Sequence, residues 1–342
     1  MLETIAKKTT NEKLDLLLFG LGPIGIQILK KSVLNHGANI LGAIDIDPDK
    51  VGKDIGDLIG TRPHGISVTS GLKKRADEPK SRKVAIHATG SNLKAVWPQI
   101  RELLDHGYSV VSTCEQLSFP WHRYPQLAKE IDQYARKKNL AVLGTGVNPG
   151  FIMDSLPVFL SSVTNEFSSI NITRKVDVSK RRIPLQKKVG VGMTKDAFNQ
   201  LATENKIGHV GLEESLRMVA HALGLELGSV DNMIEPVLAE SKMDLALCSV
   251  EIGDVCGQHQ ISKGYTKDGK EVVLELTMAA GIVQEDRIVY KGEEKVELVI
   301  PNGIFGDTAT AAIAINSAKA LSSCEQTGLL SMVDIPVTRN SR

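Results

Sequence analysis

Several features that mark specialised protein classes are missing from this 342-residue sequence. No apolar run approaches the roughly 18 residues that a membrane-spanning helix needs. Residues 1–13 are polar and lack the apolar core of an export signal. An excess of one charge is missing too, because 41 Lys and Arg stand against 40 Asp and Glu, for a formal net charge of +1. We therefore expect a cytoplasmic protein that binds neither a membrane nor nucleic acid.

Cysteine is scarce and scattered. Cys114, Cys248, Cys256 and Cys324 form no C-x-x-C pair and show no metal-ligand spacing. We therefore expect no metal site and a reducing compartment, with these cysteines serving as small core residues.

The length allows two domains, and the sequence pattern changes near residue 150. Before that point, apolar strand-like runs alternate with amphipathic helices, which is typical of a parallel sheet covered by helices. The predicted strands are 14–19, 39–46, 84–89, 109–112 and 141–143, and the predicted helices end near 35, 106 and 138. The basic stretch 73–82 is expected to be a surface excursion.

After Asn148-Pro149-Gly150 the pattern becomes that of an α+β domain. Period-two strands are predicted around 168–178, 247–262, 271–278 and 295–300, with a hairpin turn at 267–270 and helices near 195–206 and 211–223. This arrangement indicates a second domain over 151–303 with a mostly antiparallel sheet. A C-terminal helix within about 304–330 is expected to be able to return to the first domain, residues 1–150.

A glycine-rich turn follows the first strand. Residues 20–25 read Gly20-Leu21-Gly22-Pro23-Ile24-Gly25, and Asp45 stands 20 residues after Gly25 at the end of the second strand. The pattern G-x-G-x-x-G alone is weak, but between a strand and a helix it predicts a dinucleotide-binding Rossmann domain. The glycines permit a tight turn and close approach of the pyrophosphate to the helix N-terminus. A glycine-rich turn without a ligand is the alternative.

The choice of cofactor depends on Asp45, which would accept hydrogen bonds from the adenosine ribose and repel a 2′-phosphate. No arginine follows it, although Lys50 and Lys53 are close in sequence, so NAD is expected and NADP is possible. The run Thr89-Gly90-Ser91 at a later strand end is expected to line the cofactor again, with a plain turn as the alternative.

The run Ser112-Thr113-Cys114-Glu115-Gln116 lies at the carboxyl end of a predicted parallel strand, where open α/β sheets bind ligands. Thr113 and Cys114 are assigned to the cofactor site. A carboxylate flanked by apolar residues would have a pKa raised by desolvation, so Glu115 is a candidate general base. The alternative is a surface glutamate. Cys114 is less attractive as a nucleophile, because no histidine adjoins it in sequence.

Three further residues stand out in the second domain. Alternation puts Arg174 on the apolar face of its strand, which requires either an internal carboxylate or a ligand anion as partner. His259 shares a face with Val255 and Ile261 if its strand is regular, and His209 lies in a glycine-flanked turn before a helix. A lone inward histidine is more often a satisfied core residue.

Several motifs together resemble the family of 2,4-diaminopentanoate dehydrogenases and native amine dehydrogenases. They span nearly the whole chain and comprise residues 20–25, 88–91, 112–121, 148–151, 208–215 and 306–312. The Thr113-Cys114-Glu115 and Asn148-Pro149-Gly150-Phe151 segments are far more specific than the glycine motif. A similar fold occurs in dihydrodipicolinate reductases, but their His-His-x-x-Lys and Lys-x-x-x-Ser-Gly-Thr segments are missing here.

The resemblance implies a reversible oxidative deamination that yields 2-amino-4-oxopentanoate and ammonia, a step of bacterial ornithine degradation. Glu115 matches the catalytic glutamate of the family, and Asn148, Arg174, His209 and His259 match pocket positions. Our reading of the apolar face assigns the substrate carboxylate to Arg174, through a bidentate pair.

Two other functions stay open at this point. One is an amine dehydrogenase acting on simple amines and ketones, which would need Glu115 but no arginine anchor. The other is a non-catalytic NAD-binding sensor, in which Glu115 would be dispensable. We expect a homodimer, because long antiparallel sheets in such second domains often pair across a two-fold axis.

Overall fold

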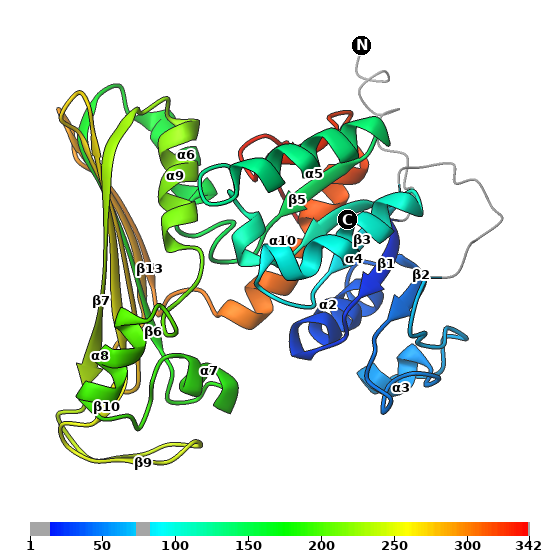
Figure 1. Cartoon of the computed structure of the whole chain (residues 1–342), viewed down its shortest axis with the longest axis horizontal. Helices are drawn as coiled ribbons and strands as arrows, with labels where there is room; N and C mark the ends of the chain where they lie inside the picture. The colour runs from blue at the N-terminus through cyan, green and yellow to red at the C-terminus, as the bar shows by residue number, and fades with distance from the viewer. Residues whose placement is uncertain (1–13, 73–82, 341–342) are drawn as a thin grey trace.

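The computed structural model describes residues 14–72 and 83–340. The polar N-terminal residues 1–13 and the basic stretch 73–82 lie outside the described residues. The chain forms two domains side by side, each built on a six-stranded sheet (Figure 1). The predicted fold class is confirmed: an α/β Rossmann-like domain is followed by a second domain with a mostly antiparallel sheet.

The first sheet is entirely parallel and has the order β14-β5-β4-β3-β1-β2. Every residue of β3, β4 and β5 is buried, as expected for strands covered on both faces. The strands are β1 (Asp15–Phe19), β2 (Asn39–Ile44), β3 (Val84–His87), β4 (Ser109–Ser112), β5 (Ala141–Gly144) and β14 (Gly328–Leu330).

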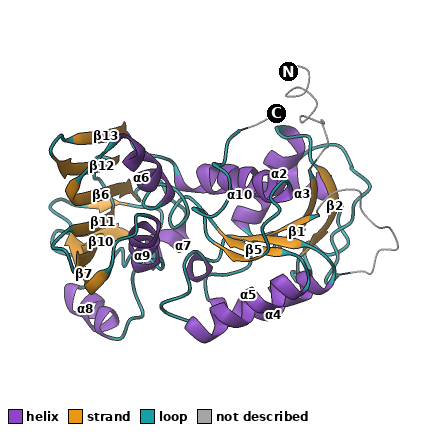
Figure 2. Cartoon of the chain, turned by 90° about the horizontal axis from the view of Figure 1, so that it is seen from above, coloured by secondary structure: helices purple, strands orange, loops and turns teal. Residues whose placement is uncertain are grey.

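Two layers of helices cover this sheet (Figure 2). One apolar core joins the sheet to α2 and α10, and another joins its opposite face to α4 and α5. The helices are α2 (Pro23–Leu34), α3 (Ile55–Ile59), α4 (Leu93–Asp105), α5 (Pro125–Lys137) and α10 (Gly306–Ser322), with the 3-10 helix η1 (Glu115–Leu117) after β4.

The chain crosses between the domains twice, once after β5 and once before α10. The second crossing returns the chain to the first domain, where α10 packs beside α2 and Gly328 pairs with Ala141. The C-terminal helix predicted within about 304–330 is α10. It ends at Ser322, and residues 328–330 form the edge strand β14, which begins at a glycine with φ +102°.

The second sheet has the order β13-β12-β6-β11-β10-β7, and its neighbours are antiparallel except for β6 and β11. The predicted strand over 247–262 is wrong at its start, because β10 begins at Val255 and residues 249–250 belong to a small ribbon. The strands are β6 (Phe167–Asp177), β7 (Leu227–Leu238), β10 (Val255–Thr266), β11 (Glu271–Ala279), β12 (Glu285–Gly292) and β13 (Val296–Pro301), with β8 (Met243–Asp244) and β9 (Ser249–Val250) as the ribbon.

Helices cover one face of this sheet, and the described residues place no helical layer on the other (Figures 1 and 2). On the covered face, Ile172, Leu274 and Ile288 belong to one apolar core with Leu216 of α9. The helices are α6 (Ser155–Leu160), α7 (Ile183–Lys188), α8 (Lys195–Thr203) and α9 (Leu212–Ala222), with the 3-10 helix η2 (Ser161–Val163).

No helix within residues 14–72 and 83–340 has the length and apolar character to cross a membrane. The four cysteines, all within the described residues, form no disulfide, and Cys114, Cys256 and Cys324 are buried.

Candidate active site

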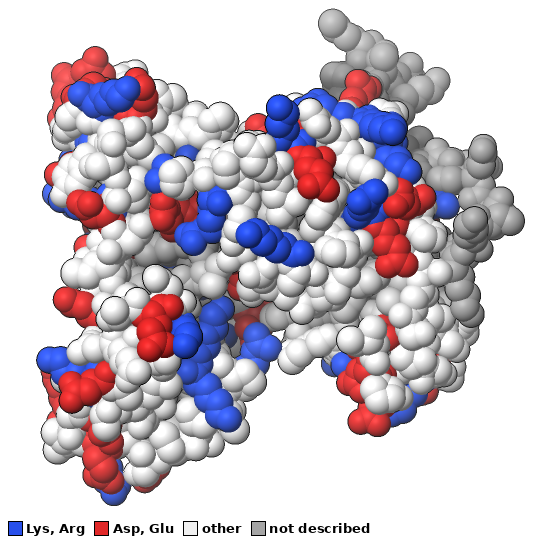
Figure 3. All heavy atoms as spheres, in the orientation of Figure 1, with Lys and Arg blue, Asp and Glu red and all other residues white. Residues whose placement is uncertain are grey.

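A cavity of about 440 Å³ lies between the two domains. The first domain contributes the glycine turn, the ends of β3, β4 and β5, and the start of α10, whereas the second contributes α7, the turn before α9 and the covered sheet face. Figure 3 shows a hollow between the domains, bordered by Lys and Arg side chains on the side of the second domain. Parallel strand ends, a glycine turn and a second domain therefore meet at one place.

The glycine turn has the geometry that a dinucleotide requires. Gly20 has φ +93°, and a Cβ there would lie 2.7 Å from the Ala88 carbonyl oxygen. A Cβ at Gly25 would lie 1.9 Å from the Gly20 oxygen, so this glycine allows the helix to pack on the turn. A Cβ at Gly22 would meet nothing within 4 Å, and Gly22, Pro23 and Ile24 line the cavity. The open space beside Gly22, at the N-terminus of α2, fits a cofactor phosphate.

Asp45 braces the glycine turn. Its carboxylate accepts hydrogen bonds from the Leu21 amide at 2.6 Å and from the Asp47 amide at 2.9 Å. Lys50 Nζ lies 3.5 Å from Asp45 and 2.9 Å from Asp47. The Asp45 carboxylate lies just after β2 but does not line the cavity. Lys50, which the sequence placed only close by, is ion-paired with it and partly offsets its charge.

Thr89, Gly90, Ser91 and Thr113 all line the cavity, as predicted for cofactor residues. A buried histidine that the sequence analysis missed supports them. His87 Nδ1 lies 2.9 Å from Ser112 Oγ, and its Nε2 lies 2.8 Å from Gln99 Oε1. Burial lowers the pKa of His87 to about 4, so the ring is neutral at pH 7.

Cys114 does not face the cavity, and its assignment to the cofactor site is corrected in this respect. The side chain is buried in the apolar core beneath α4 and α5. Burial and the nearby Glu115 carboxylate raise the pKa of the thiol to about 12. The thiol is therefore a core group and not a nucleophile.

Glu115 opens the 3-10 helix η1 directly after β4, and its side chain lines the cavity. The expected apolar surroundings are only part of its environment, because Lys188 Nζ of α7 lies 3.8 Å from its Oε1. Gly211 keeps this region open: a Cβ there would lie 2.7 Å from Pro149 and 3.5 Å from the Glu115 Cβ. Lys188 is a second residue that sequence reasoning missed, since no local pattern distinguishes it from other helix-end lysines.

Asn148 and His209 form a half-buried pair in the cavity wall. Asn148 Nδ2 lies 3.3 Å from His209 Nε2, and the His209 amide donates to Gln260 Oε1 at 2.6 Å. Burial, with Lys188 and Arg174 nearby, lowers the pKa of His209 to about 3, so its ring is neutral. Asn148 Oδ1 and His209 Nδ1 are both buried and find no hydrogen-bond partner within residues 14–72 and 83–340, which leaves an acceptor and a ring nitrogen for a ligand.

Arg174 lines the cavity, but its partner is an internal carboxylate. Its Nη1 donates to both oxygens of Asp286, at 2.9 and 3.0 Å, and its Nη2 donates to the Ile304 carbonyl at 2.8 Å. Asp286 also accepts from the Ile304 amide at 2.7 Å. Of the two partners that sequence left open, the structure supplies the carboxylate, and the expected free anion anchor at Arg174 is corrected accordingly.

His259 lies on the face of the second sheet that no helix covers, so its predicted place in the substrate pocket is wrong. It pairs with Thr277 across β10 and β11, and its Nδ1 lies 2.9 Å from Thr277 Oγ1. Gln258, one residue earlier, points to the covered face and lines the cavity. The shift by one residue puts the two side chains on opposite faces.

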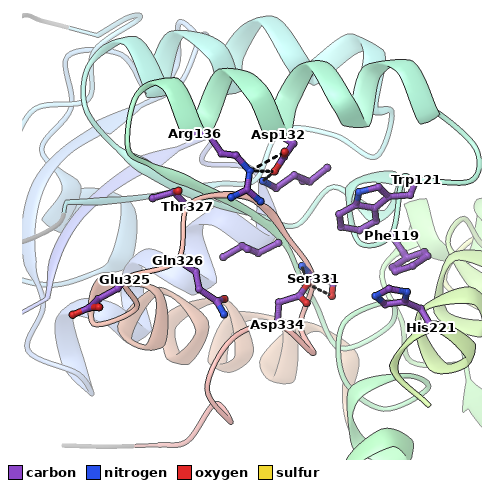
Figure 4. Close-up of a pocket in the computed structure, with 12 residues that line it drawn as sticks. Phe119, Trp121, Asp132, Arg136, His221, Glu325, Gln326, Thr327, Ser331 and Asp334 are labelled. Carbon is purple, nitrogen blue, oxygen red and sulfur yellow. Dashed lines mark hydrogen bonds and ion pairs between the residues drawn. The ribbon is translucent and has the colours of Figure 1, made fainter. Parts of the chain in front are cut away.

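A second cavity of about 780 Å³ lies between α5, the C-terminal segment and α9 (Figure 4). Phe119, Trp121 and His221 form an aromatic wall on one side. On the other side Arg136 is paired with Asp132. This second cavity shares no lining residue with the cavity at Glu115. Among the described residues, no group of three or more His, Cys, Asp or Glu could hold a metal ion.

Residues 151–341, more than half of the chain, match a family model described as the 2,4-diaminopentanoate dehydrogenase C-terminal domain. Over 337 residues the sequence is 27% identical to 2,4-diaminopentanoate dehydrogenase from Acetoanaerobium sticklandii, which covers 96% of this chain and 95% of that protein.

Solved structures share the fold. The amine dehydrogenase from Mycobacterium smegmatis aligns with a TM-score of 0.84 at 22% identity, over 96% of this chain and 98% of that chain. The myo-inositol 2-dehydrogenase from Lactobacillus plantarum aligns with a TM-score of 0.55 at 13% identity, over 90% of this chain and 88% of that chain. The architecture is therefore one that dehydrogenases use.

Proposed function

Because the chain belongs to the 2,4-diaminopentanoate dehydrogenase family, we propose that it oxidises 2,4-diaminopentanoate at C4. Water is consumed, 2-amino-4-oxopentanoate and ammonium are released, and NAD(P)⁺ is reduced with loss of a proton. One observation carries the proposal: the glycine turn, Glu115 and the unpartnered oxygen of Asn148 line a single cavity.

The chain is an NAD(P)-dependent amine dehydrogenase. The cofactor supplies the hydride acceptor when it is bound, and residues 22–24 and 88–91 would hold it. Both segments follow strand ends of the parallel sheet, and the space beside Gly22 admits a phosphate.

Glu115 is the residue that moves protons. It accepts a proton from the C4 ammonium and passes it to solvent, so that it is a carboxylate again when the hydride leaves that carbon and its negative charge stabilises the iminium cation. It then accepts a proton from the water that adds to the iminium and returns this proton to the nitrogen, which leaves as ammonium. Asn148 Oδ1 offers an acceptor to an N–H of the same nitrogen, since it has no hydrogen-bond partner among the described residues. The neutral His209 adds no positive charge beside the developing cation.

A simple amine without a carboxylate is the second candidate substrate. Asp286 balances the charge of Arg174, and Val176, Leu276 and Met278 add an apolar wall. The two candidates differ in whether the cavity binds an anion at the end opposite the reacting amine.

An absorbance assay of cofactor reduction with 2,4-diaminopentanoate, ornithine and 2-aminobutane tests the proposal. We expect the highest kcat/KM with 2,4-diaminopentanoate, and product analysis should give 2-amino-4-oxopentanoate. Higher kcat/KM with 2-aminobutane would favour the simple amine dehydrogenase. Failure of folded protein to oxidise any of the three would refute both functions.

We also propose that NAD is preferred to NADP. Asp45 places a carboxylate after β2, although Lys50 beside it partly offsets its charge. The ratio of kcat/KM for NAD⁺ and NADP⁺ measures the preference. Asp45→Ser should shift the ratio toward NADP⁺, whereas Asp57→Ser, on the exposed surface of α3, should not.

We propose that the uncovered face of the second sheet joins two copies of the chain. Met233 is exposed on this face, and some of the charged groups of the face are paired within the chain, as in Arg287 with Glu285 and Glu297. Light scattering should give twice the chain mass of 37.0 kDa. Met233→Glu should weaken the dimer, whereas Leu34→Glu on α2 should not, and a monomeric wild-type protein would contradict the proposal.

A further inference from the structure

Arg181 is a buried cation in the wall of the active-site cavity. Only 6% of its surface is exposed, and its Nε and Nη1 are buried with no hydrogen-bond partner in the part of the chain that the structure describes. Its Cζ lies 3.8 Å from the ring centroid of Phe305, so the aromatic ring covers one face of the guanidinium. The N–H groups point in the plane of the guanidinium, and an acceptor must therefore approach its edge.

Among the described residues, no carboxylate forms an ion pair with the Arg181 guanidinium. Asp307 and Asp177 act on it at longer range, but Asp307 is ion-paired with Arg182 at 3.6 Å and Asp177 accepts hydrogen bonds from Ser179. Arg174 differs in this respect, because both Asp286 oxygens contact it. A buried guanidinium without an anion is costly, so this position is suited to a ligand that brings one.

A glycine adjoins this group. Residue 306 is glycine, and a Cβ there would be in ordinary contact with Arg181 Nη2, at 3.4 Å. Gly306 is also the first residue of α10, whose N-terminus adds a partial positive charge on the same side. Both residues line the cavity that contains Glu115. An anion held here would share the cavity with the reacting amine.

We propose that Arg181 binds the carboxylate of the substrate and so selects amino acids over simple amines. The inference rests on the proposed function and names its specificity residue. Arg174 then serves as a positioning residue, since its contacts with Asp286 and Ile304 fix the segment that leads to Phe305 and Gly306. A carboxylate anchored at one end of the substrate also determines which of its two amine-bearing carbons reaches Glu115.

Ligand binding tests the inference without turnover. Calorimetry on the full chain saturated with reduced cofactor compares 4-oxopentanoate with pentan-2-one, which carries a methyl group in place of the carboxylate. We expect wild-type protein to bind 4-oxopentanoate about ten- to a hundredfold more tightly. Arg181→Gln should abolish this preference, and Arg181→Lys should retain part of it, because a lysine keeps the charge but loses the planar edge.

Lys180→Gln is the matched control, since it removes a positive charge from the adjacent exposed position and should leave the preference unchanged. Melting curves identify any variant that fails to fold. If Arg181→Gln does not fold, the test rests on Arg181→Lys, whose preference for 4-oxopentanoate over pentan-2-one should be smaller than that of the wild-type protein. An unchanged preference in folded Arg181→Gln would overturn the inference. Weaker cofactor binding in that variant, with the preference intact, would assign Arg181 to a cofactor phosphate instead.

The same measurement separates the inference from the proposed function. If 2,4-diaminopentanoate is not oxidised but 4-oxopentanoate binds through Arg181, the proposed reaction fails and the anion subsite stands. If 2,4-diaminopentanoate is oxidised with equal KM by wild-type and Arg181→Gln proteins, the reaction stands and the subsite fails.

Discussion

Lys188 Nζ lies 3.8 Å from Glu115 Oε1, so an ammonium on α7 of the second domain faces the carboxylate at the end of β4 in the first. The pair places the proposed proton acceptor at the contact between the domains. Glu115→Gln keeps the shape of the side chain but cannot accept a proton. We expect kcat to fall by about 10²- to 10⁴-fold, with cofactor affinity and melting temperature nearly unchanged.

Cofactor reduction and fluorescence titration with reduced cofactor measure these quantities. Glu204→Gln is a suitable control, because Glu204 pairs with Lys206 in an exposed turn far from the cavity lining. Retention of more than a tenth of the wild-type kcat in Glu115→Gln would rule out its proposed role.

Gly22 and Gly25 should respond differently to the same substitution. Gly22→Ala adds a methyl group to open space, so the protein should fold normally but bind the cofactor about tenfold more weakly, by roughly 1.4 kcal/mol. Gly25→Ala would bring a Cβ to 1.9 Å from the Gly20 oxygen, so it should lower the melting temperature. Titration and thermal unfolding of both variants check the contrast, and equal melting temperatures would contradict it.

Arg174 and Asp286 should contribute to stability as a pair. Burial lowers the pKa of Arg174 and raises the pKa of Asp286, so desolvation opposes their mutual attraction. Arg174→Gln would leave Asp286 buried without its cation and should lower the free energy of unfolding by about 3–5 kcal/mol. Adding Asp286→Asn should restore part of it, because asparagine can still accept from the Ile304 amide. Urea unfolding that shows additive losses would argue against this coupling.

His87 should make the first domain sensitive to acid. Its folded pKa of about 4 is below the unfolded value of 6.5, so the unfolded chain binds a proton first as the pH falls. This contribution leaves stability unchanged above pH 6.5 and lowers it by about 1.4 kcal/mol per pH unit between 6.5 and 4. His87→Gln should reduce the loss in urea unfolding between pH 7 and pH 4.5, and an identical loss in both proteins would refute the assignment.

The features that sequence predicted well depend on local patterns. Neighbouring residues determine the glycine turn and the alternation of strands and helices in the first domain. The positions of β1 and α2 could therefore be predicted from them. β7 was not predicted from the sequence. All of its residues are exposed or half-buried, and its sequence shows no regular alternation of apolar and polar residues. It is an edge strand of its sheet, so its apolar side is incomplete.

The errors at the site arise from contacts distant in sequence. The Asp286 partner of Arg174 lies 112 residues away, so alternation could show that a partner was needed but not which one. The misplacement of His259 has a different cause. The covered face of β10 carries the polar residues Gln258, which lines the cavity, and Gln260, which bonds the His209 backbone, whereas Ile261 lies on the uncovered face. The apolar pattern therefore indicated the wrong face.

The two crossings between the domains determine how the cavity can open. They lie next to each other, since the Val147 amide of the first donates to Thr310 Oγ1 just after the second, at 3.4 Å. Domains joined by two adjacent hinges rotate chiefly about the line between them, and twisting about other axes is opposed. That line runs beside Asn148 and Gly306. A rotation about this line would open the cavity to substrate and product while leaving this end of the site assembled.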